Sequence, residues 1–164
     1  MKKVLLPLTL LLAFSVGTGF ASPINNLTKD QTAVGILLHT DQNSYYIENK
    51  VTDTLTVGYE KIKVKNIDMD DFHLQFDTNP NAKVLLGLRD LNSSSRAYAG
   101  LALTAQLNTD AMGYASLIGG NHFTELQVGV NYRLTEGYDL NLNYRALNYQ
   151  HYNDVTTIGV SYKF

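Results

Sequence analysis

The chain has 164 residues, of which 13 are Lys or Arg and 15 are Asp or Glu, for a formal net charge of −2. This mild acidity, without any basic run, excludes a surface built to bind a nucleic-acid backbone. The absence of cysteine excludes structural disulfides and a lipid-modified N-terminal cysteine. The length predicts a single domain.

The first 21 residues have the three-part layout of a secretory signal peptide. Lys2 and Lys3 precede the apolar run 4–16, and Gly19 and Ala21 occupy the −3 and −1 positions of a cleavage site. The rival interpretation is a membrane anchor, but this run is shorter than the roughly 20 residues that a spanning helix needs. We therefore expect export and cleavage after Ala21, which leaves 143 residues with 11 basic and 15 acidic side chains.

Residues 22–30, Ser-Pro-Ile-Asn-Asn-Leu-Thr-Lys-Asp, form an N-terminal periplasmic segment ahead of the first predicted strand. Two arrangements are open for this segment. It is either a loose periplasmic tail or a small plug that enters the space enclosed by the strands.

Strict alternation of apolar and polar residues is the main signal over 31–164, and it is clearest over 125–134, 138–146 and 156–164. Turn-forming residues separate the alternating segments, with 66–70 as one longer loop. Together they predict ten strands, at 31–39, 44–51, 55–63, 71–78, 82–90, 97–106, 112–118, 123–134, 138–147 and 154–164. The segments 44–51 and 112–118 are the least regular, and losing one hairpin would leave eight strands. The clearest segments have roughly the length of a tilted membrane strand.

The polar face of these strands is rich in charge and in glycine. A soluble sandwich or lipocalin-like barrel exposes its charges, whereas a membrane barrel turns them inward. Glycine weakens an exposed strand, but on a narrow inner wall it makes room for a neighbouring side chain. We therefore predict a transmembrane antiparallel up-and-down β-barrel (all-β) over 31–164. Its lumen-lining candidates are Glu48, Lys50, Glu60, Lys83, Arg89, Glu125, Arg133, Asp139, Arg145 and Lys163, with His73 and the glycines Gly35, Gly58, Gly87, Gly100, Gly129 and Gly159. Three apolar residues are also predicted to face inward, namely Leu37, Leu85 and Leu117.

Aromatic residues on the apolar face cluster near strand ends. At one end stand Tyr132, Tyr138, Tyr162 and Phe164, and at the other Tyr45 and Phe72. This is typical of the interfacial girdles of membrane barrels. A faint internal repeat, 51–59 against 134–144, further predicts two similar tight turns on the same side of the barrel.

The C-terminus carries the most specific feature, an alternating apolar row that ends on the last residue. The row consists of Ile158, Val160, Tyr162 and Phe164. It resembles the C-terminal signal by which outer-membrane proteins are recognised by the barrel-assembly machinery. The mature chain is similar to the class of small outer-membrane barrels with eight to ten strands. The resemblance implies location in a bacterial outer membrane, with outer-membrane lipids and the assembly machinery as partners, no nucleic-acid partner and a monomeric state.

The predicted role is structural or that of a narrow, porin-like channel. Barrels of about eight strands are filled by side chains, and wide aqueous pores appear at about 16–18. We expect no enzyme activity, cofactor or metal. The first alternative is a lipid-modifying or hydrolytic enzyme at the outer rim, drawn from His39, His73, His122 and His151 with Ser44, Ser93, Ser94, Ser95, Asp41, Asp70, Asp71 and Asp154. The second alternative is an adhesin or receptor. Such barrels use long outer loops for recognition, and the predicted outer connections here are short, which disfavours this alternative.

Overall fold

The computed structural model describes residues 22–40, 42–64, 67–91, 94–148 and 154–164. The predicted signal peptide and the rim-enzyme candidates Asp41, Ser93 and His151 lie outside the described residues. Among the described residues, no helix is long and apolar enough to cross a membrane.

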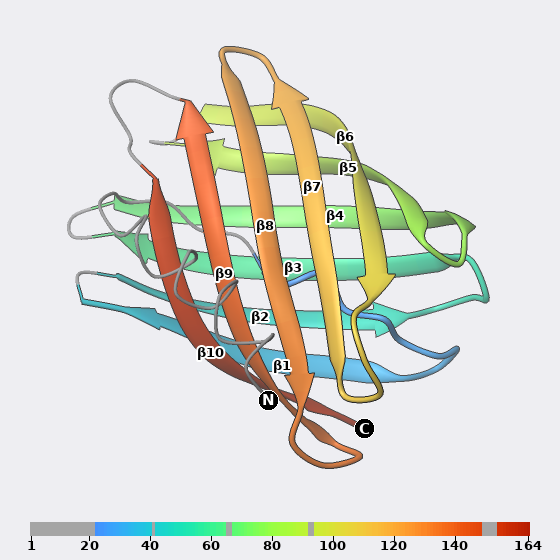
Figure 1. The fold of residues 1–164 in the computed structure, drawn as a ribbon. Helices are drawn as coiled ribbons and strands as arrows, with labels where there is room; N and C mark the ends of the chain where they lie inside the picture. The colour runs from blue at the N-terminus through green and yellow to red at the C-terminus, as the bar shows by residue number, and fades with distance from the viewer. Residues whose placement is uncertain (1–21, 41, 65–66, 92–93, 149–153) are drawn as a thin grey trace.

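Ten antiparallel strands close into a barrel over the described chain (Figure 1). They are β1 (Thr32–His39), β2 (Gln42–Lys50), β3 (Leu55–Val64), β4 (Ile67–Asn79), β5 (Ala82–Leu91), β6 (Ser94–Gln106), β7 (Ala111–Gly120), β8 (Phe123–Arg133), β9 (Tyr138–Asn148) and β10 (Val155–Lys163). Each strand pairs with its neighbours in sequence, and β1 pairs with both β2 and β10. The all-β, ten-stranded, up-and-down barrel is therefore confirmed, and the eight-stranded alternative is wrong.

Pairing of β1 with β10 closes the barrel. The end of the barrel where β1 begins and β10 ends is here called the proximal end, and two hydrogen bonds join the strands there. The amide N–H of Thr32 donates to the carbonyl oxygen of Phe164 at 2.8 Å, and the Phe164 N–H donates back at 2.9 Å. Because every strand has two partners, no strand edge remains in the described barrel for pairing with another chain.

Strand boundaries differ from the prediction by up to four residues, and the start of β4 and the end of β7 show the reason. Residues 66–70 were predicted to be a loop, but β4 begins at Ile67 and pairs with β3 from Val64↔Ile67 onward. Gly119 and Gly120 were predicted to begin a turn, but they belong to β7. In both cases hydrogen bonds to the neighbouring strand continue past the point where turn-forming residues predict that the strand ends. Strand pairing therefore overrides the local turn propensity.

Three turns at the proximal end share one hydrogen-bond pattern. The N–H groups of Val51 and Thr52 both donate to the carbonyl oxygen of Leu55. The 134–138 turn repeats this pattern, as the sequence repeat predicted, and so does the 107–111 turn, which the repeat did not include. The three turns join β2 to β3, β6 to β7 and β8 to β9, so they fix the same short connection at one side of the barrel.

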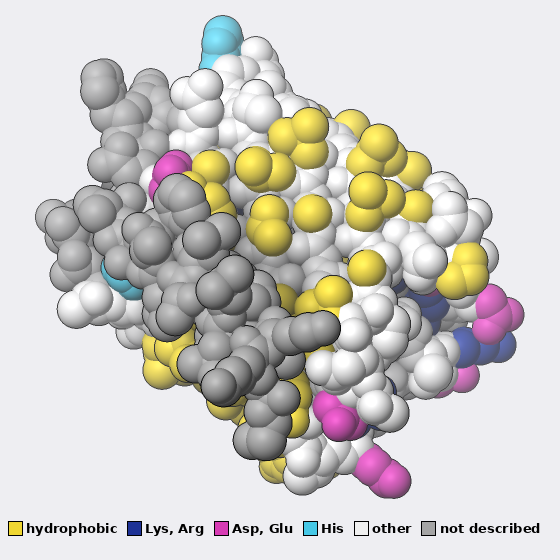
Figure 2. Space-filling view, in the orientation of Figure 1, with side chains coloured by type: hydrophobic (Ala, Val, Ile, Leu, Met, Phe, Trp, Pro, Cys, Tyr) yellow, Lys and Arg dark blue, Asp and Glu magenta, His cyan; other side chains and the backbone are white. Residues whose placement is uncertain are grey.

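The outer surface of the barrel is apolar. Every strand exposes at least one large apolar side chain, and the fractional exposure reaches 62% at Leu101 on β6. Figure 2 shows these side chains spread over the visible face, with charged side chains gathered toward the edge where the proximal turns lie. An aromatic cluster sits at the proximal end: the Tyr138 and Tyr162 rings are 4.7 Å apart, and the Tyr162 and Phe164 rings 5.5 Å.

The inner wall alternates glycine with large side chains from the next strand. A Cβ atom on Gly35 would lie 2.4 Å from the Tyr46 ring, and one on Gly87 would lie 2.3 Å from the Tyr98 ring. Gly58 faces His73 in the same way. These contacts explain why glycine stands on a face where it otherwise weakens a strand.

One inward prediction is wrong. Leu37 and Leu85 are buried inside the barrel as predicted, but Leu117 is 55% exposed on the outside. In β7 the buried positions are Ala111, Tyr114, Ser116 and Ile118. Because apolar residues occur on both faces of this strand, its phase could not be read from alternation alone.

Candidate functional site in the barrel lumen

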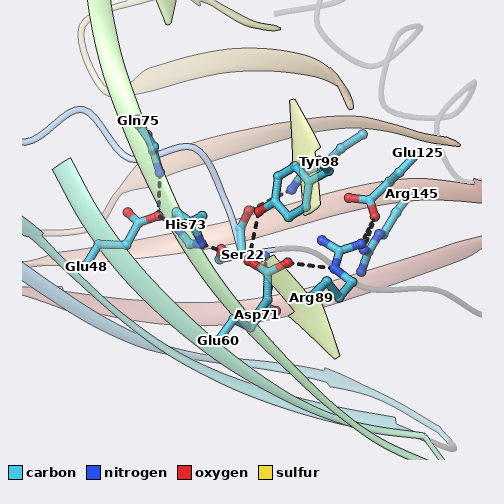
Figure 3. Close-up of polar contacts among 11 residues, drawn as sticks. Ser22, Glu48, Glu60, Asp71, His73, Gln75, Arg89, Tyr98, Glu125 and Arg145 are labelled. Carbon is cyan, nitrogen blue, oxygen red and sulfur yellow. Dashed lines mark hydrogen bonds and ion pairs between the residues drawn. The ribbon is translucent and has the colours of Figure 1, made fainter. Parts of the chain in front are cut away.

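A chain of ionic contacts crosses the middle of the lumen (Figure 3). It runs from Glu48 on β2 through His73 and Asp71 on β4 to Arg89 on β5. From there it continues through Glu125 on β8 to Arg145 on β9, by two short contacts to the same carboxylate oxygen. We call these six residues the central network. All six side chains are buried, and they come from five different strands.

His73 joins two carboxylates. Its Nδ1 lies 3.1 Å from Asp71 Oδ1, and its Nε2 lies 3.1 Å from Glu48 Oε1. A carboxylate accepts hydrogen bonds and does not donate them. Both ring nitrogens therefore carry a proton, and the side chain contributes a positive charge to the network. Gln75 Nε2 adds a second donor to Glu48 Oε1, at 2.7 Å.

Arg89 holds the centre of the network. Its Nε donates to Asp71 Oδ2 at 2.6 Å, and its Nη1 contacts Glu125. The guanidinium also stands 5.3 Å from the centre of the Tyr98 ring and 5.5 Å from that of Phe123, within cation–π range. The Tyr98 hydroxyl donates to Asp71 Oδ1 at 2.9 Å. These contacts hold the Arg89 side chain across the lumen, which narrows the lumen.

The N-terminal segment lies inside the barrel. Asp30 turns the chain at the proximal end, with a left-handed φ of 65°, and its N–H donates to the Lys50 carbonyl oxygen at 2.7 Å. From there the chain enters the lumen (Figure 1, blue), where Ser22, Ile24 and Asn25 are buried. Of the two arrangements that the sequence left open, the structure shows the plug.

Polar side chains from the barrel wall bind the backbone of this segment. Gln127 Nε2 donates to the Ser22 carbonyl oxygen at 2.8 Å, and Asn131 Nδ2 donates to the Ile24 carbonyl oxygen at 3.0 Å. Asn25 Nδ2 donates to Glu48 Oε2 at 2.9 Å. The segment is thus bound to both β2 and β8, on different sides of the lumen.

A second group of ion pairs lines the proximal mouth. Asp77 accepts from Lys50 by a short contact and from Lys83 at 2.7 Å. On the other side, Lys163 Nζ lies 2.5 Å from Asp139 Oδ2. Arg133, a predicted lumen residue, is exposed at this mouth rather than buried, because it is the last residue of β8.

The spaces between these groups are small. A cavity of about 30 Å³ in the central lumen is bordered by Ser22, Glu60, Asp71 and Arg89. A cavity of about 80 Å³ at the proximal mouth is bordered by Asn26, Arg133, Asp139 and Lys163, among others. A cavity needs roughly 10–15 Å³ to hold one water molecule, so these spaces accept a few waters and not a sugar.

The sequence missed several residues that line the lumen. Asp71 and Asp77 are central to the ion pairs, but Asp71 had been placed near the outer rim because β4 was predicted to begin there. Alternation in step with His73 and Gln75 could have placed both aspartates inside. The inward rings of Tyr46, Tyr98 and Tyr114 were also missed, and each faces a glycine on an adjacent strand, which is a signal that only strand register reveals.

Three of the four candidate histidines of the rim-enzyme alternative lie in the described part of the chain, and they stand at separate places in it. His73 is in the central lumen and not at the rim. His39 Nδ1 lies 2.9 Å from the Thr156 carbonyl oxygen, and His122 occupies a tight turn with a φ of 66°. Within the described ranges, no group of three or more His, Asp or Glu residues is arranged to hold a metal ion.

Comparisons with known proteins support the fold. No family model matches the chain, and no curated protein matches it. Among solved structures, "KdgM porin in complex with disordered oligogalacturonate" is 10% identical, with a TM-score of 0.53 over 82% of this chain and 99% of that one. "KdgM porin" is 9% identical over the same shares, with a TM-score of 0.52. The NanC porin is 6% identical over 81% of this chain and 97% of that one, with a TM-score of 0.50. The chain therefore has the closed antiparallel barrel fold found in small outer-membrane porins.

Proposed function

We propose that this protein is a bacterial outer-membrane barrel whose role is structural or that of a very narrow channel. The apolar exterior supports the membrane location: exposed leucine, valine and tyrosine surround the barrel, while charges face the axis. In water this arrangement would expose far more apolar area than a soluble protein leaves uncovered. In lipid it matches the outward apolar band and polar interior of membrane barrels.

The observation that carries the narrow-channel role is the filled lumen. The central network links β2, β4, β5, β8 and β9 across the axis, and the N-terminal segment occupies space beside it. The two lumen cavities bordered by described residues, of about 30 and 80 Å³, fit only a few waters. We infer that water and small ions are the largest species that cross without rearrangement of these groups.

The ligand of the similar porin structure does not transfer to this chain. An oligogalacturonate is a polyanionic sugar chain, and a channel for it needs free cations along an open bore. Here Arg89 and Arg145 are paired with carboxylates, and Lys50 and Lys83 share Asp77. We therefore do not propose that an acidic oligosaccharide passes through this barrel.

Planar-bilayer and liposome-swelling measurements on the mature chain test the proposal. We expect insertion from detergent, conductance far below that of a wide porin, and no swelling driven by monosaccharide uptake. Large and weakly selective conductance would contradict the filled lumen. A mature chain that is folded and monomeric in buffer without detergent would contradict the membrane location.

A further inference from the structure

We propose that the α-ammonium group of Ser22 is the counter-ion of Glu60 and fastens the N-terminal segment inside the lumen. This inference rests on the proposed export of the chain, with cleavage after Ala21. Hydrolysis of the Ala21–Ser22 peptide bond by a leader peptidase consumes one water. It leaves a carboxylate on Ala21 and an ammonium group on Ser22, so removal of the leader itself creates the cation that the lumen binds.

Glu60 is the exception among the buried carboxylates of the central lumen. Glu48, Asp71 and Glu125 each contact a cationic side chain. Glu60 is equally buried, at 2% exposure, but the contact that the structure gives its Oε2 is the backbone nitrogen of Ser22, at 2.8 Å. Figure 3 shows Ser22 and Glu60 among the side chains of the central network.

The side chains of the central lumen carry one more carboxylate than cations, and the compensating excess, Lys50 and Lys83 on the single carboxylate of Asp77, lies at the proximal mouth. The central lumen holds four carboxylates, from Glu48, Glu60, Asp71 and Glu125, and three cationic side chains, from His73, Arg89 and Arg145. A buried carboxylate without a cation is strongly unfavourable. An ammonium group on Ser22 raises the number of cations to four and places the new charge at the one carboxylate that lacks a cationic contact.

The surroundings of Ser22 suit an ammonium group better than a peptide N–H. A peptide nitrogen donates one hydrogen bond, whereas an ammonium group donates three. The cavity of about 30 Å³ adjoins Ser22, and the carboxylates of Glu60 and Asp71 border it. This volume holds a water molecule that can take a further proton of the ammonium group. Glu60 Oε1, which accepts no hydrogen bond from the described residues, supplies another acceptor.

The rest of the segment is built to hold its end at this position. Gln127 and Asn131 bind the carbonyl oxygens of Ser22 and Ile24. Ile24 packs in an apolar cluster with Tyr98 and Ile118, and Leu27 packs against Ala33 and Tyr46. These contacts fix the register of the segment, so the first residue after the expected cleavage position reaches Glu60.

Amine labelling of the folded mature protein tests this inference. The protein is exported with its own leader, extracted in detergent and treated with an amine-reactive ester, and intact-mass and peptide mass spectrometry locate the label. We expect the mature chain to begin at Ser22, with an α-amino group that is protected in the folded barrel and reactive after unfolding. The exposed Lys29 serves as the internal control and reacts in both states.

Glu60→Gln separates the ion pair from simple burial. Glutamine keeps the size of the side chain but removes its charge, so we expect the Ser22 amine to react about tenfold faster or more as the segment opens locally, with a rise in single-channel conductance. The matched control is Glu136→Gln in the exposed β8–β9 turn, which leaves both readouts unchanged. The heat-dependent mobility shift on gels shows that each variant is folded.

A second preparation avoids any side-chain change. A wild-type chain acetylated only at the Ser22 nitrogen keeps an N–H donor but loses the charge, and we expect its conductance to rise as in Glu60→Gln. An unchanged conductance in the acetylated chain, an equally protected amine in Glu60→Gln, or a mature N-terminus at another residue would each overturn the inference. Insertion and low wild-type conductance report on the proposed function separately, so the two can fail independently.

Discussion

The carboxylate of Glu125 bridges two arginines, and its removal tests the central network most directly. In Glu125→Gln the side chain keeps its shape but loses its charge. Arg89 retains Asp71 at 2.6 Å. Arg145 is fully buried and its one hydrogen bond to a carboxylate in the described structure is to Glu125, so it becomes a buried cation without its ion-pair partner. Breaking a buried pair in this way costs about 3–5 kcal/mol of unfolding free energy.

The size of this effect makes it measurable in urea. With an m-value of about 2 kcal/mol/M, the unfolding midpoint of Glu125→Gln falls by roughly 2 M. The assay is urea unfolding of the refolded mature chain in lipid vesicles, followed by far-UV circular dichroism. The matched control, Glu136→Gln on the exposed turn, stays within about 0.5 kcal/mol of wild type.

A double-mutant cycle identifies the cause. Adding Arg145→Met to Glu125→Gln removes the unpaired cation and recovers about 2–3 kcal/mol, because the two residues are coupled. A loss below about 1 kcal/mol in the single variant, or a double variant no more stable than the single one, would refute the argument that these charges are buried and mutually compensating.

Three further predictions address the wall, the exterior and the seam. Gly35→Ala drives a methyl group into the Tyr46 ring, 2.4 Å away, and is expected to destabilise by about 1–3 kcal/mol in the same urea assay, whereas Gly119→Ala, with nothing within 4 Å, is neutral. Leu101→Arg puts a charge on the most exposed apolar side chain of the outer surface and is expected to cost about 2–4 kcal/mol if lipid surrounds it, so a neutral result would argue against the membrane. Deleting Phe164 removes the end of the proposed assembly signal and its two backbone hydrogen bonds to β1, and heat-modifiable, membrane-integrated protein is then expected to fall on gels of outer-membrane fractions, with unchanged levels contradicting the signal.

Much of the fold could be predicted because strand alternation and turn chemistry are local. The period of two places Glu48 and Lys50, or Glu125 and Gln127, on one face without knowledge of the partner strand. Turn residues located eight of the ten strand beginnings to within two residues. They failed at β4, where pairing with β3 continues to Ile67, and at β6, where pairing with β5 continues to Ser94. The local pattern was also insufficient for Leu117, because β7 carries apolar residues on both faces.

The contacts within the lumen depend on how the closed barrel staggers its strands. Arg89 and Glu125 are 36 residues apart and come from strands that do not pair with each other, so no local pattern connects them. The same holds for Gln127 and the Ser22 carbonyl oxygen, which are separated by 105 residues. Such partners become neighbours only once closure brings opposite walls within reach of a side chain.

The amino-acid sequence by itself determined the ten strands, the face that each regularly alternating strand turns toward the barrel axis, and the apolar exterior. Each of these follows from the spacing of residues along one stretch of chain. Tertiary structure alone decided which charges meet, that tyrosines fill the notches left by glycines, and that residues 22–30 return into the lumen. Those outcomes arise from closure and stagger of ten strands around one narrow axis, where the free energy of a buried charge depends on the group that faces it from across the barrel.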